Sequence, residues 1–97
     1  MLKNIYSYAF YKCSNLKRII IPENFEGFGR GVFYCCTSLK SIYIYNANPP
    51  SGATSLFDDE VYSHSVPAGL IIYVPSEAIE NYKNSNWKIY NIKLIEK

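Results

Sequence analysis

The sequence predicts a mainly β fold with short helical segments, an α/β-type solenoid in which two to three repeats of about 23 residues stack and end in a C-terminal cap. Three observations predict it. Two stretches are alike at a constant offset, each ends in an alternating apolar string, and a helical pattern follows position 75. With 48% hydrophobic residues and a net charge of +2, the 97-residue chain is not intrinsically disordered and has the size of one domain.

The internal repeat relates residues 5–21 to residues 28–44. Seven of these seventeen positions are identical, and most of the identities are apolar, as a shared packing role requires. The identical pairs are Phe10 and Phe33, Tyr11 and Tyr34, Cys13 and Cys36, Leu16 and Leu39, Lys17 and Lys40, Ile19 and Ile42, and Ile21 and Ile44.

Each copy contains the string Leu-x-x-Ile-x-Ile, which predicts a β-strand. Ile19 and Ile21 are separated by one residue, so both side chains point to one face, and Ile42 and Ile44 repeat this spacing. Copies stacked about 4.8 Å apart would form a ladder with a continuous interior. The Phe-x-x-Cys-x-x-Leu segment before each strand is expected to form the turn and the opposite wall. Gly29 is expected to permit the turn that feeds the second repeat, since glycine adopts positive φ without steric penalty.

Residues 48–75 are predicted to form an irregular third repeat. Phe57 follows Phe33 at nearly the repeat spacing, whereas Ile72 follows Ile42 at a clearly larger spacing. The difference indicates an inserted loop of about seven residues, and insertions in solenoids project from one face.

Residues 76–97 are predicted to form the C-terminal cap. Pro75 ends the third strand, and Ser76 is the expected N-cap of a short helix that presents Tyr82 on its apolar face. Trp87 is expected to cover the open end of the stack. An exposed ligand platform is the alternative for Trp87.

These motifs resemble the BspA-like leucine-rich repeats of bacterial surface proteins, which share this repeat length. The resemblance rests on Ala9-Phe10-x-x-Cys13-x-x-Leu16-x-x-Ile19-x-Ile21-Pro22, on its second copy, and on an ending that comprises Asn48-Pro49-Pro50, Leu56-Phe57, Ile71-Ile72-Tyr73-Val74-Pro75, Tyr82-Lys83 and Trp87. It implies one leucine-rich-repeat domain over 1–97, with two regular repeats (1–47), the irregular repeat (48–75) and the cap (76–97).

The resemblance also implies a role. The chain would be the C-terminal portion of a repeat array in a cell-surface or secreted bacterial protein, although no signal peptide is visible. Family members are associated with adhesion to host proteins. A non-catalytic protein-recognition module is therefore expected, and a carbohydrate-binding module is the alternative.

Catalytic and metal-binding signatures are weak. His64 with Asp58 or Asp59 could be combined into a hydrolase, but no Gly-x-Ser-x-Gly elbow is present. Asp58, Asp59 and Glu60 lack the spacing of a calcium loop, and one histidine without a Cys-x-x-Cys pair does not make a zinc site. No enzyme activity, cofactor or metal is expected.

The three cysteines are an odd number, so they cannot all pair within the chain. Cys13 and Cys36 occupy equivalent repeat positions and are expected to pack as small hydrophobes. A disulfide between them is the alternative. Cys35 replaces Lys12 in the repeat and is expected to be the more exposed, reactive thiol.

The charge distribution and the hydropathy of the chain speak against nucleic-acid binding and against a membrane span. Basic residues are dispersed and the isoelectric point is about 8.4, which disfavours nucleic acid. No apolar run approaches the roughly 20 residues of a membrane span.

The outward face of the predicted strands is the candidate binding site. Period-two alternation places Ile20, Tyr43 and Tyr73 in one outward row, and Tyr45 extends the aromatic surface. Aromatic and arginine side chains are typical of protein-recognition surfaces, whereas tyrosines could also stack on sugars or be ordinary β-formers. The neighbouring outward row comprises Arg18, Ser41 and Ile71.

The N-terminal end shows no capping pattern. Leu2-x-x-Ile5 aligns with Phe25-x-x-Phe28, so the chain begins within a repeat. Further repeats are expected upstream in a parent protein, and the chain alone is expected to self-associate through residues 1–28, since uncovered strand edges pair readily.

Overall fold

The computed structural model describes residues 4–10, 12–57 and 66–95. Up to Val74 the described residues form short strands, turns and the 3-10 helix η1, and further short helical segments and strand β6 follow. The elements are β1 (Asn4–Ile5), β2 (Arg18–Ile21), β3 (Gly27–Phe28), β4 (Ser41–Ile44), η1 (Ala53–Ser55), β5 (Ile71–Val74), η2 (Ser76–Ala78), α1 (Ile79–Lys83), η3 (Asn86–Ile89) and β6 (Asn91–Leu94).

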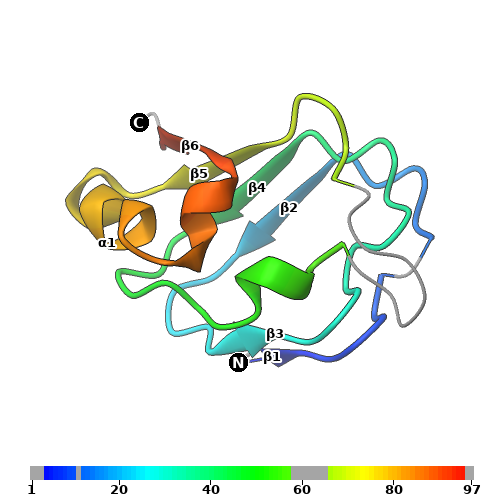
Figure 1. The fold of residues 1–97 in the computed structure, drawn as a ribbon, viewed down its shortest axis with the longest axis horizontal. Helices are drawn as coiled ribbons and strands as arrows, with labels where there is room; N and C mark the ends of the chain where they lie inside the picture. Colours follow the sequence, from blue (N-terminus) through cyan, green and yellow to red (C-terminus); the bar gives the residue numbers. More distant parts are fainter. Residues whose placement is uncertain (1–3, 11, 58–65, 96–97) are drawn as a thin grey trace.

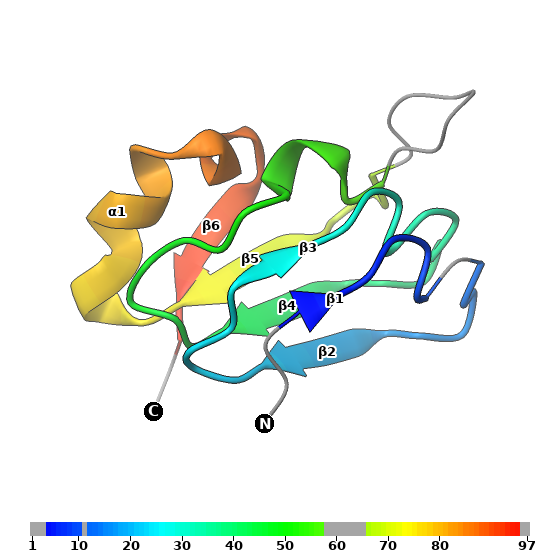
Figure 2. The same ribbon diagram turned by 90° about the horizontal axis from the view of Figure 1, so that it is seen from below.

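The strands form two parallel sheets on opposite sides of the core. The main sheet has the order β2-β4-β5-β6, and the smaller one pairs β1 with β3. Figure 1 shows the main sheet across the upper part of the molecule and the β1–β3 pair along its lower edge. Figure 2 shows α1 and β6 together at one end of the main sheet.

Equivalent repeat positions pair in register. Ile19 lies opposite Ile42, Ile42 opposite Ile72, and Ile72 opposite Ile92. The first of these pairings confirms the ladder predicted from the offset between the two copies. Strands β4 and β5 stay in register although extra residues precede β5. A slip of one residue would turn the apolar side chains of β5 toward solvent.

The wall opposite the main sheet repeats in the same way. The Phe10 and Phe33 rings are stacked with centroids 5.8 Å apart, and Phe57 lies 6.0 Å from Phe33. The backbones of successive coils are hydrogen-bonded to each other at the same positions. Phe10 N donates to Val32 O, and Phe33 N donates to Leu56 O. Phenylalanine therefore forms a column inside the fold, as its sequence positions predicted.

The turns of the two regular copies share their backbone conformation. Tyr8 and Gly31 occupy equivalent repeat positions and have φ of 61° and 65°. Lys12 and Cys35 are likewise equivalent and have φ of 58° and 61°. The expectation for Gly29 was wrong, since the left-handed glycine in this turn is Gly31.

Glycine is required at position 29 for a different reason. A Cβ there would lie 2.3 Å from the backbone nitrogen of Ser7. The two coils approach each other more closely than any side chain allows, because Gly29 N donates to Ile5 O at this point.

The C-terminal segment differs from the sequence prediction in two places. Residues Asn91–Leu94 form a fourth strand of the main sheet, which was not expected. Ser76 does not cap a helix, because it lies within η2 after Pro75 and its hydroxyl lies 3.3 Å from a carboxylate oxygen of Glu77.

Buried polar contacts tie this segment to residues 46–50. The Tyr82 hydroxyl donates to Asn46 O at 3.0 Å, and the Trp87 indole nitrogen donates to Pro50 O at 2.8 Å. The buried Asn46 side chain in turn accepts from Phe25 N and donates to Phe25 O. Residues 46–50, which follow β4, are thus hydrogen-bonded both to Phe25, which precedes β3, and to Tyr82 and Trp87 in the C-terminal helical segments.

Burial of Tyr82 predicts loss of stability in alkali. Desolvation raises the pKa of its phenol above the ordinary value of 10, so the folded chain keeps a proton that the unfolded chain loses. This contribution is full below about pH 10 and decreases as the pH rises further. In urea unfolding between pH 8 and 11.5, Tyr82→Phe is expected to flatten the decline in unfolding free energy; an unchanged slope would contradict the assignment.

Candidate functional site

The outward side chains of the main sheet form two rows. Ile20, Tyr43 and Tyr73 lie side by side across β2, β4 and β5, as the alternation predicted. The neighbouring row places Arg18 beside Ser41 and Ser41 beside Ile71. We call these six residues, with Asn91 and Lys93 of β6, the outer face.

Strand β6 contributes two members that the sequence reasoning missed. Asn91 lies opposite Ile71, and Lys93 lies opposite Tyr73. The signal was the alternation of Tyr90, Ile92 and Leu94, which has the period of a strand. Residues 76–97 were all assigned to a cap, and this alternation was therefore not interpreted as a strand.

The centre of the outer face is a stacked aromatic pair. The Tyr43 and Tyr73 rings are 4.6 Å apart with an interplanar angle of 11°, and both side chains are half-buried. The Arg18 guanidinium carbon lies 5.7 Å from the Tyr43 centroid, on the β2 side of that ring. The faces of Tyr43 are therefore covered by Tyr73 and Arg18, and the pair presents ring edges and hydroxyl groups.

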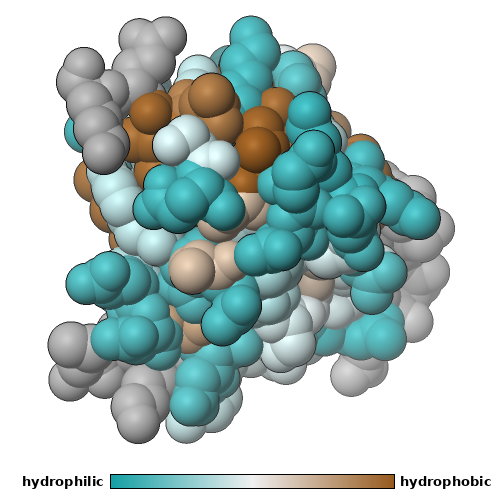
Figure 3. Space-filling model, turned by 90° about the vertical axis from the view of Figure 1, so that its left-hand side faces the viewer, coloured by the Kyte–Doolittle hydropathy of each residue, from teal (hydrophilic) through white to brown (hydrophobic). Residues whose placement is uncertain are grey.

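Tyr45 lies beyond the end of β4 and does not join the stack. It is 42% exposed, and its amide donates to Ile21 O. With Glu23, Pro75 and Glu77 it lines a groove of about 190 Å³ at the carboxyl ends of the strands. Figure 3 shows the left-hand end of Figure 1, where hydrophilic side chains cover most of the surface and apolar ones gather near the top.

Charge is distributed unevenly along the strands. Lys17 and Arg18 are exposed at the start of β2, and Lys40 precedes β4 and donates to Ala68 O. Glu23 and Glu77 lie at the other end. Within the described ranges, no three His, Cys, Asp or Glu side chains are grouped closely enough to hold a metal ion.

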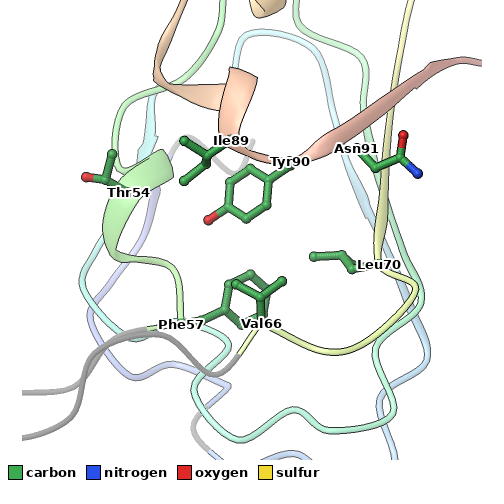
Figure 4. Close-up of a pocket in the computed structure, with 7 residues that line it drawn as sticks. All are labelled: Thr54, Phe57, Val66, Leu70, Ile89, Tyr90 and Asn91. Carbon is green, nitrogen blue, oxygen red and sulfur yellow. The ribbon is translucent and has the colours of Figure 1, made fainter.

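A separate pocket of about 300 Å³ opens beside β5 and β6. Figure 4 shows the rings of Tyr90 and Phe57 on either side of it. Two aliphatic side chains at its rim, Val66 and Ile89, are 45% and 56% exposed. Nothing in the sequence pattern predicted this pocket, which is lined by Thr54, Phe57, Val66, Leu70, Ile89, Tyr90 and Asn91.

The cysteines are free thiols. Cys36 is buried and its Sγ donates to Phe10 O, which confirms its predicted packing role. Burial also raises the pKa of the Cys36 thiol. Cys35 and Cys13 are both half-buried, so Cys35 is more accessible than Cys36 but is not set apart from Cys13.

The residues considered for hydrolysis or calcium binding, Asp58, Asp59, Glu60 and His64, lie outside the described residues. Trp87 is buried against Phe28, Tyr82 and Tyr90, so it is not an exposed ligand platform. No helix among the residues with described structure has the length and hydrophobicity of a membrane span.

The repeats, their shared backbone geometry and their register define a leucine-rich-repeat protein. The model of the BspA type leucine rich repeat region matches residues 1–96, and the chain belongs to this family. A search of curated proteins finds no match.

A solved structure supports the fold. The crystal structure of pneumococcal vaccine antigen PcpA superposes with a TM-score of 0.55 over 99% of this chain, at 23% sequence identity. The chain spans only 28% of that protein's chain.

Proposed function

We propose that this chain is a non-catalytic recognition module of a larger bacterial surface or secreted protein, and that it binds a protein partner through the outer face. We further propose that its repeats form part of a solenoid, with residues 1–47, 48–75 and 76–97 as regular repeats, irregular repeat and cap. The observation that carries the functional proposal is the stacked Tyr43–Tyr73 pair with Arg18 against it.

This cluster suits protein recognition because it is already ordered. Binding usually costs conformational entropy at each side chain that becomes immobilised. The tyrosines are held by their neighbours on β4 and β5, and Arg18 is held over a ring. Tyrosine and arginine are also among the side chains most enriched at positions that dominate binding energy.

Carbohydrate binding is the weaker alternative for the same residues. A tyrosine that stacks on a sugar needs an uncovered ring face. Tyr43 has one face against Tyr73 and the other beside Arg18, and Tyr73 has Lys93 as its neighbour on the far side. The outer face therefore offers hydroxyl groups and a guanidinium more readily than a flat platform.

The test is capture of candidate extracellular host proteins on a biosensor, with the double variant Tyr43→Ala, Tyr73→Ala. We expect the dissociation constant of a captured partner to rise about 100-fold or more, since two central aromatic contacts of roughly 1.4 kcal/mol or more each are removed. The matched control is Tyr6→Ala, an exposed tyrosine outside the outer face.

Circular dichroism must show that the double variant stays folded. Unchanged affinity in the folded double variant would exclude the outer face as the binding site. Retention of glycans on an array by the wild type, lost in the same variant, would favour the carbohydrate alternative instead.

A further inference from the structure

The charged side chains of the outer face are both positive. They are Arg18 on β2 and Lys93 on β6, and each is exposed. Binding surfaces of proteins are arranged so that their electrostatic potentials are complementary, which favours a partner with negative groups here. The remaining members of the outer face are neutral, and they are Ile20, Ser41, Tyr43, Ile71, Tyr73 and Asn91.

The two cations lie on opposite sides of the stacked tyrosine pair. Strands β4 and β5, which carry Tyr43 and Tyr73, separate β2 from β6. Three strand spacings of about 4.8 Å and an offset of two residues place the backbones of Arg18 and Lys93 about 16 Å apart. The Arg18 guanidinium lies beside the Tyr43 ring, so this side chain inclines toward β4 and the charges are closer than the backbones. A further coil beside β2 would leave this arrangement in place, because outward side chains project from the plane of the sheet.

Negative groups border the outer face at one end only. Glu23 and Glu77 line the groove at the carboxyl ends of the strands, whereas Lys17 is exposed at the amino end of β2. Acidic residues of a partner are repelled from the groove and attracted to Arg18 and Lys93, since like charges that face each other across an interface weaken binding. The charge pattern therefore restricts where the acidic residues of a partner can lie.

We propose that the protein partner presents to the outer face an extended segment with two acidic residues four positions apart and an apolar residue midway between them. This inference rests on the proposed recognition function and names the chemistry of the partner. In an extended segment, positions i, i+2 and i+4 share one face, and i and i+4 are about 13 Å apart. The segment crosses the strands, with its carboxylates at Arg18 and Lys93 and its central side chain on the edges of Tyr43 and Tyr73.

The arrangement of the outer face suits such a segment better than a polyanion. Sulfated polysaccharides and nucleic acids are bound where positive charge is concentrated in a patch or stripe. Here a half-buried aromatic pair separates Arg18 from Lys93. The centre of the outer face therefore offers its contacts to an apolar side chain, which a polyanion lacks.

A titration with defined peptides tests the proposal. The probe is the end-blocked peptide Gly-Ser-Glu-Thr-Phe-Thr-Glu-Ser-Gly, added to the nitrogen-15-labelled chain and followed by nuclear magnetic resonance. We expect saturable shifts at the amides of β2, β4, β5 and β6. The peptide with both glutamates replaced by lysine should bind at least tenfold more weakly. The isomer Gly-Ser-Glu-Glu-Phe-Thr-Thr-Ser-Gly has the same charge without the spacing and should bind severalfold more weakly.

Charge-reversed variants assign the binding to the two cations. Arg18→Glu combined with Lys93→Glu should weaken binding of the acidic peptide at least tenfold and make the lysine peptide the preferred one. Lys83→Glu combined with Lys88→Glu is the matched control. It changes the net charge equally at exposed positions outside the outer face and should leave the order of the peptides unchanged.

Several outcomes would overturn the acidic segment. They are no binding of the acidic peptide, equal binding of its isomer, unchanged preference in the variant with reversed Arg18 and Lys93, or tighter binding of a heparin fragment at the same amides. The recognition function fails separately. A captured protein that is lost by Tyr43→Ala, Tyr73→Ala but kept by the charge-reversed variant would support recognition and contradict the acidic segment alone.

Discussion

Replacement of Phe33 by alanine is expected to remove a large part of the chain's unfolding free energy. Phe33 is fully buried, with its ring centroid 5.8 Å from Phe10, 5.9 Å from Phe28 and 6.0 Å from Phe57. A Phe→Ala change in a core costs about 3–5 kcal/mol. A domain of this size has only about 5–15 kcal/mol in total. Urea unfolding followed by far-UV circular dichroism measures the loss.

Phe10→Ala is the matched control, because it removes the same side chain from the equivalent position at the end of the column. Phe10 is half-buried, and among the described residues its ring stacks on one phenylalanine, Phe33. We expect its cost to be about half that of Phe33→Ala or less. Equal costs would contradict the view that burial arises from stacking between coils.

Trp87→Ala is expected to have an effect of similar size. The indole is buried, donates to Pro50 O, and has ring neighbours in both the repeat and the helical end. Its loss should cost about 3–5 kcal/mol and detach residues 76–95 from the sheet. Hydrogen exchange should show the amides of α1 and β6 losing protection first.

Trp87→Phe separates the hydrogen bond from the packing. It keeps an aromatic ring but leaves Pro50 O without its donor, which costs about 1–3 kcal/mol. Wild-type tryptophan fluorescence should be blue-shifted. Water-exposed emission in the wild type, together with unchanged stability of Trp87→Ala, would show that the indole does not hold this end of the fold.

The sequence predicted strands β2 and β4 and their register because the repeat carries both, whereas β1, β3 and β6 were not predicted. Phe33 and Ile42 recur from Phe10 and Ile19 at the same offset, and identical environments require equivalent positions to face the same interior. The outward positions of Tyr43 and Tyr73 followed from period-two alternation, which fixes their neighbours once Ile42 and Ile72 are paired.

Other features depend on contacts between segments that lie far apart in the sequence. Strand β6 follows three helical segments, and its Ile92 pairs with Ile72 only because those segments return the chain to the sheet. The need for Gly29 comes from the close approach of Ser7 in the preceding coil. Stacking of Tyr43 on Tyr73 depends on ring orientation, which period-two alternation leaves open.

The central claim is that equivalent repeat positions lie side by side in one continuous ladder. Nuclear Overhauser spectroscopy on a sample with labelled isoleucine methyl groups tests it most directly. We expect cross-peaks linking Ile19 to Ile42, Ile42 to Ile72, and Ile72 to Ile92, with none between Ile19 and Ile72. Absence of the Ile42–Ile72 cross-peak in a folded sample, or a direct contact between Ile19 and Ile72, would contradict the ladder.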